Sequence, residues 1–124
     1  MTFRPVARGL VLALTALVLS ASGPALAHGR LARAEPAADS KLKPPPSEVR
    51  LTFTEGLEPA YSGLQVKDER GAQVDRKDAH VDSANPLLLR ASLEPLPPGL
   101  YTVSWRILSV DGHVSEGRFA FRVE

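Results

Sequence analysis

His28 is the residue whose place in the chain most directly suggests chemistry. It follows Ala25-Leu26-Ala27, a small-x-small pattern typical of a signal-peptide cleavage site. Cleavage after Ala27 leaves a free α-amino group and an imidazole on one residue. Together these two groups can chelate a metal ion, which the side chain of an interior histidine cannot do.

A second histidine lies far along the chain, in Asp111-Gly112-His113. Side chains two positions apart in an extended segment or turn can project to the same side. Asp-Gly is also a strong signal for a hairpin turn, so Asp111 can be a turn former or a metal partner. An amine and two imidazoles in a plane favour copper(II), and a carboxylate from Asp111 or Glu55 could complete the site or orient an imidazole.

The first 27 residues have the three parts of a secretion signal. Arg4 and Arg8 supply positive charge, residues 10–19 are apolar, and Ser-Gly-Pro at 22–24 precedes the cleavage site. The apolar stretch is short for a membrane span, which needs about 20 residues. We therefore predict a signal peptide at 1–27 and one exported domain at 28–124, against the alternative of an uncleaved anchor.

The composition of the mature chain narrows its possible functions. Losing Arg4 and Arg8 leaves 13 basic against 14 acidic residues, a net charge of −1 with neutral histidines, so the chain has no basic character suited to nucleic acid. The chain has no cysteine, and its single methionine is Met1. The mature protein therefore has no sulfur ligand, which excludes a thioether-rich copper(I) site.

The rest of the chain has the pattern of an all-β domain. Apolar and polar residues alternate with a period of two, which is typical of half-buried strands. Proline and glycine punctuate these segments, which favours a sandwich or small barrel of about seven strands. The segment at 43–47, KPPPS, is expected to be an extended linker between the first two strands. The clearest strand segments are residues 49–54, 64–66, 87–93, 101–107 and 119–123.

The other residues whose side chains could bind a ligand or metal are better explained by structural roles. His80 lies among charged residues without a partner at metal-ligand spacing, and we expect it to be a surface residue. Trp105 and most of the phenylalanines occupy strand positions typical of a core. The sequence has no phosphate-binding glycine loop and no Ser/His/Asp arrangement that would indicate an enzyme.

Several motifs in this order resemble the CopC family of copper-resistance proteins, and the similarity covers essentially all of residues 28–124. The motifs are His28-Gly29-Arg30-Leu31, AEPAADS at 34–40, LTFTE at 51–55, YTVSWR at 101–106, SVDGH at 109–113 and GRFAF at 117–121. The resemblance implies a periplasmic protein with an immunoglobulin-like or cupredoxin-like Greek-key β-sandwich.

The resemblance also implies a ligand set for one copper(II) ion per monomer. His28 would provide amine and imidazole, His113 the second imidazole, Asp111 an axial or nearby oxygen, and Glu55 an acidic group close to the site. The methionine-rich copper(I) loop of two-site members has no counterpart in residues 63–82. A monomeric copper carrier or buffer is the function implied, with a CopD-type membrane protein as the partner that receives copper for import.

Two other classes of function remain as alternatives. A terminal-histidine chelate with a second histidine also resembles the copper site of lytic polysaccharide monooxygenases, which are oxidative enzymes. Those enzymes use a broad substrate face with exposed aromatic side chains, whereas most of the six aromatic residues here fall on predicted buried faces. The other alternative is an immunoglobulin-like interaction module without metal. We expect a binding protein, not an enzyme.

Overall fold

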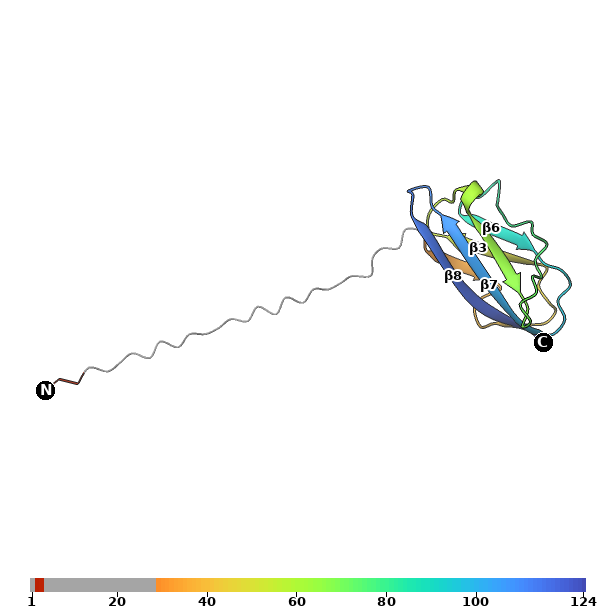
Figure 1. Cartoon of the computed structure of the whole chain (residues 1–124), viewed down its shortest axis with the longest axis horizontal. Helices are drawn as coiled ribbons and strands as arrows, with labels where there is room; N and C mark the ends of the chain where they lie inside the picture. The colour runs from red at the N-terminus through yellow and green to blue at the C-terminus, as the bar shows by residue number, and fades with distance from the viewer. Residues whose placement is uncertain (1, 4–28) are drawn as a thin grey trace.

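The fold is a sandwich of two four-stranded sheets, seen in a computed structural model that describes residues 2–3 and 29–124. The first sheet has the order β1-β3-β6-β5, with β1 Leu31–Glu35, β3 Glu48–Phe53, β6 Leu88–Ser92 and β5 His80–Val81. The second has the order β2-β8-β7-β4, with β2 Lys41–Leu42, β8 Val114–Val123, β7 Gly99–Leu108 and β4 Gly63–Lys67. The two sheets face each other in Figure 1. The all-β prediction is confirmed.

The alternating pattern places the apolar residues between the sheets. Val49, Leu51 and Phe53 of β3 are buried, and their neighbours in sequence are not. They meet Val103 and Ile107 of β7, which are fully buried on the opposite sheet. Burial of this apolar surface is the main favourable term in folding, at about 25 cal/mol per Å².

Two short strands were not predicted from the sequence. The strands β2 and β5 have two residues each, so the described residues contain eight strands where about seven were expected. The strand β2 pairs in parallel with the end of β8, through Lys41 to Arg122 and Leu42 to Val123. The predicted linker at 43–47 therefore follows this short strand instead of the first strand.

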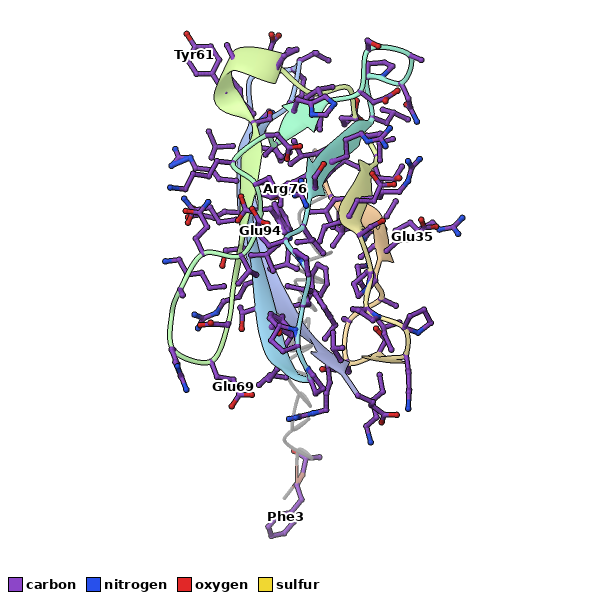
Figure 2. The ribbon with its side chains drawn as sticks, turned by 90° about the vertical axis from the view of Figure 1, so that its right-hand side faces the viewer. Phe3, Glu35, Tyr61, Glu69, Arg76 and Glu94 are labelled. Atoms are coloured by element: carbon purple, nitrogen blue, oxygen red, sulfur yellow. The ribbon has the colours of Figure 1, made fainter. Side chains whose placement is uncertain are left out.

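The long β7–β8 hairpin determines which end of the sandwich holds the candidate site. Its ten paired positions run from Gly99↔Val123 to Leu108↔Val114. The turn lies at the same end as the single-turn 3₁₀ helix η1 Pro59–Tyr61, and the C-terminus lies at the other end (Figure 1). Figure 2 shows Tyr61 and Glu69, which flank β4, at opposite ends of the molecule. In the part of the chain described, no helix is long and apolar enough to cross a membrane.

Candidate metal centre

The turn between β7 and β8 is a five-residue connection, from Ser109 to His113. The Ser109 N–H donates to the His113 carbonyl oxygen at 2.9 Å, and the Gly112 N–H donates to the Ser109 carbonyl oxygen at 2.8 Å. Gly112 has a φ of +90°, a value that glycine adopts without a Cβ clash. The predicted hairpin turn at Asp-Gly is therefore confirmed.

The turn brings Asp111 and His113 together. Asp111 Oδ1 lies 3.3 Å from His113 Nδ1 and accepts the His113 backbone N–H at 3.3 Å. The histidine side chain is 61% exposed and the aspartate side chain 31% exposed, so an ion from solvent can reach the imidazole. An imidazole whose Nδ1–H faces a carboxylate offers its Nε2 lone pair to a metal.

Ser109 is a residue at this site that was not predicted from the sequence. Its side chain is fully buried, and its Oγ donates a short hydrogen bond to Asp111 Oδ1. The same Oγ lies 3.1 Å from the His113 carbonyl oxygen. The signal was present in the sequence, because Ser109 continues the inward-facing positions of β7 after Ile107 and is the one polar residue among them.

The chain that follows His28 lies against this turn. Gly29 is buried, and a Cβ built on it would be 2.8 Å from Ile107 Cδ1 and 3.4 Å from Ser109 Oγ. Arg30 is fixed to Thr54 by two hydrogen bonds, from the Arg30 N–H at 3.1 Å and to the Arg30 carbonyl at 2.9 Å. His28 itself lies outside the described residues, as does the predicted cleavage site.

Glu55 lies at the same end of the sandwich, just after β3. The next residue, Gly56, accepts the Val110 N–H at 2.9 Å, and Leu57 forms a β-bridge with Ser109. Across residues 2–3 and 29–124, no three or more His, Asp or Glu side chains group closely enough to hold a metal ion. The turn thus brings Asp111 and His113 together. Glu55 is half-buried just after β3, and among the described residues it does not form a group of three with them.

His80 lies on the other sheet, in β5. It is exposed, and its Nδ1 is 2.7 Å from the Asp78 carbonyl oxygen. Hydrogen bonds from Ser92, with a smaller effect of the His80 charge, hold the pKa of Asp78 below its usual value. The position agrees with the prediction that His80 is a surface residue.

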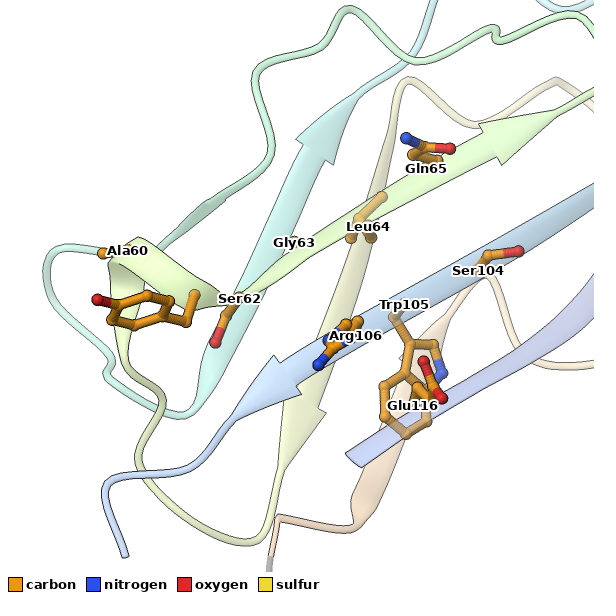
Figure 3. Close-up of a pocket in the computed structure, with 10 residues that line it drawn as sticks. Ala60, Ser62, Gly63, Leu64, Gln65, Ser104, Trp105, Arg106 and Glu116 are labelled. Atoms are coloured by element: carbon orange, nitrogen blue, oxygen red, sulfur yellow. The ribbon is translucent and has the colours of Figure 1, made fainter. Parts of the chain in front are cut away.

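A shallow hollow of about 560 Å³ lies along β4, β7 and β8 (Figure 3). Its walls include Gln65, Trp105, Arg106 and Glu116, and neither Asp111 nor His113 lines it. Trp105 contacts Phe53 edge to face, with ring centroids 5.0 Å apart, which is a core contact. The hollow is therefore separate from the candidate metal ligands.

Known proteins similar to this chain include both relatives and solved structures. Protein YobA from Escherichia coli (strain K12) is 33% identical over 120 residues, which are 95% of this chain and 97% of YobA. The crystal structure of CopC from Methylosinus trichosporium OB3b superposes with a TM-score of 0.69 and 34% identity, over 78% of this chain and 94% of that one. PcoC, described as a methionine-rich copper resistance protein from Escherichia coli, gives a TM-score of 0.67 and 30% identity, over 79% and 100%.

The family model for the CopC domain matches residues 31–124, which include the whole sandwich and the Asp111–His113 turn. The family model, the sequence identities and the fold all indicate the same family. The chain is a member of the CopC family.

Proposed function

We propose that the mature protein begins at His28, binds one copper(II) ion and serves as a periplasmic copper carrier or buffer. The observation that carries this proposal is the contact of Gly29 with Ser109, beside the Asp111–His113 pair. Consecutive Cα atoms are about 3.8 Å apart, so a terminal residue that precedes Gly29 begins close to this turn. An amine, two imidazoles and a carboxylate are then available in one region.

Each ligand has a distinct role in the proposed site. His28 supplies its α-amine and imidazole, and His113 supplies Nε2. Asp111 contacts the Nδ1 side of His113 at 3.3 Å, which suits an orienting carboxylate that can also give an axial oxygen. Glu55 adds negative charge nearby, through a chain segment that is hydrogen-bonded to the turn.

The donor atoms favour copper(II) over copper(I). Residues 28–124 contain no methionine or cysteine, whereas PcoC is named as methionine-rich. Nitrogen and oxygen donors in a tetragonal arrangement suit copper(II), and copper(I) prefers sulfur. The site we propose is therefore a single copper(II) site.

The exposure of the ligand side chain supports a carrier. His113 is 61% exposed at the tip of a hairpin, so a second protein can approach the ion directly. We propose a monomer that gives copper to a CopD-type membrane importer. Among the six aromatic side chains after residue 28, Tyr61 alone is exposed, which offers little surface for the polysaccharide substrate of an oxidative copper enzyme.

The test compares two exported forms with N-termini verified by mass spectrometry, one beginning at His28 and one retaining Ala27. We expect the extra residue to weaken copper(II) binding by orders of magnitude, because the amine becomes an amide, and His113→Ala to weaken it similarly. The electron paramagnetic resonance spectrum of the shorter form should show nitrogen-rich tetragonal copper(II). Equal affinity of the two forms would refute the terminal chelate, and turnover with oxygen and a reductant would favour an enzyme.

A further inference from the structure

Ser109 occupies a position that connects both parts of the proposed copper site. Its side chain is fully buried, its Oγ donates to the Asp111 carboxylate, and its backbone N–H donates to the His113 carbonyl at 2.9 Å. A Cβ built on Gly29 would lie 3.3 Å from Ser109 Cβ. One side chain therefore contacts both the turn and the segment that follows His28.

We propose that Ser109 is a positioning residue of the metal site, whose buried hydroxyl fixes the Asp111 carboxylate and, through it, the His113 imidazole. The proposal rests on the copper(II) function proposed above and adds a residue that does not itself bind the ion. The carboxylate oxygen that accepts from Ser109 is also the one 3.3 Å from His113 Nδ1. The hydroxyl thus restricts the rotation of Asp111, and Asp111 restricts that of the ring.

A serine is stable at this buried position because two hydrogen-bond acceptors lie beside its hydroxyl. A buried hydroxyl without a hydrogen bond costs about 1–3 kcal/mol, so a serine at an inward strand position requires a partner. Asp111 Oδ1 and the His113 carbonyl provide that partner in the turn itself. Alanine at this position would keep the Cβ that lies against Gly29 and remove only the hydroxyl.

The test is Ser109→Ala, with Ser62→Ala as the matched control. The Ser62 hydroxyl also contacts the end of β7, where it accepts the Leu108 N–H at 3.2 Å, and its partners are backbone atoms of Leu108. Loss of a group that orients a metal ligand typically costs 10–100-fold in metal affinity. We expect Ser109→Ala to lose about 10–100-fold in copper(II) affinity, and Ser62→Ala to stay within about twofold of the parent protein.

Two further measurements separate positioning from folding. In the copper-free protein, amide exchange at His113 should accelerate in Ser109→Ala, and in the copper(II) form the paramagnetic resonance parameters should change. Ser109→Thr keeps a hydroxyl and should retain copper affinity within a few-fold. The inference is overturned if Ser109→Ala binds like the parent, if Ser62→Ala loses as much, or if the threonine variant behaves like alanine.

The His113→Ala variant distinguishes this inference from the function on which it rests. If His113→Ala abolishes binding and Ser109→Ala does not weaken it, only the positioning role is wrong. If His113→Ala binds copper(II) as tightly as the parent protein, the proposed site itself is wrong.

Discussion

Gly29→Ala is the substitution that most directly tests whether the start of the domain is held against the hairpin turn. Gly29 has a φ of +71°, and a Cβ there would lie 2.8 Å from Ile107 Cδ1. The segment cannot easily move aside, because Arg30 is hydrogen-bonded to Thr54 in both directions. An alanine therefore forces a displacement of Gly29, of Ile107, or of both.

The magnitude follows from two separate costs. A left-handed φ costs a residue with a Cβ about 1–2 kcal/mol. Overpacking a buried position costs about 1–3 kcal/mol more. Gly71 provides the matched control, since its φ is +80° and nothing lies within 4 Å of a Cβ built on it. We expect Gly71→Ala to lose about 1–2 kcal/mol of unfolding free energy, and Gly29→Ala about 1–3 kcal/mol beyond that.

The assay is urea unfolding of the copper-free protein, followed by copper(II) titration of the same samples. If His28 is a ligand as proposed, Gly29→Ala should also bind copper at least about tenfold more weakly, because the substitution would move this ligand relative to His113. Gly71→Ala should bind like the parent. Equal unfolding free energies for the two variants would refute the packing of Gly29, and an unchanged copper affinity in Gly29→Ala would refute its role in placing the N-terminus.

Three further predictions concern the sandwich itself. Gly117→Ala should lose about 1–3 kcal/mol of unfolding free energy and shift the tryptophan emission, because its Cβ would lie 2.6 Å from Trp105 Cζ2. Asp75→Ala should lose about 2–3 kcal/mol in urea unfolding, because the buried carboxylate accepts three hydrogen bonds, one of them from a buried backbone N–H. A hydrogen bond from Arg90 lowers the pKa of Asp82. The ionised Asp82 carboxylate therefore contributes its full stabilisation above about pH 4, its pKa in the unfolded chain, and this stabilisation is lost as pH falls through its lower pKa in the folded protein. Acid unfolding of Asp82→Asn and of the parent protein should show this difference.

The controls for these variants come from positions with the same residue type but without the contact. Gly63→Ala in β4 should be nearly neutral, since nothing lies within 4 Å of a Cβ built at that position. Asp68→Ala should cost less than Asp75→Ala, because Asp68 binds backbone N–H groups in an exposed turn. If either control lost as much as its partner, the specific contact would not be the cause. For Asp82, an acid unfolding curve identical to that of the asparagine variant would contradict the pKa argument.

The long strands could be predicted from the sequence because each has enough residues to show alternation. Strand β3 buries every second side chain, β7 does so over much of its length, and β8 alternates exposed with half-buried or buried residues, so the pattern of Val49, Leu51 and Phe53 appears directly in the structure. The strands β2 and β5 could not be predicted, since two residues show no period. They are defined by pairing with a longer strand: β2 pairs with the distant β8, through Lys41 and Arg122, and β5 pairs with β6, through His80 and Arg90.

One part of the candidate site could likewise be predicted from the sequence, and another part could not. The turn at Asp111 and His113 could be predicted because these residues are only two positions apart and the Asp-Gly pair between the strands favours a hairpin turn. The contact of Gly29 with Ser109 joins residues 80 positions apart, and only the packing of the two sheets brings them together. The role of Ser109 depends on its burial. A period of two extended by one more residue would have revealed that burial.

The proposed ligand set also ties copper binding to protein export. The chelating amine does not exist while residues 1–27 are attached, because the nitrogen of His28 is then part of a peptide bond. Asp111 Oδ1 and His113 Nδ1 lie 3.3 Å apart in the turn, so the turn can offer one imidazole and one carboxylate to an ion. In the proposed site, the folded domain supplies the turn, with Ser109 and Gly29 packed beside it, and cleavage after Ala27 would supply the amine that completes the ligand set. From the proposed ligand set we therefore expect the precursor to bind copper(II) more weakly than the processed protein, which copper(II) titration of the two forms would measure.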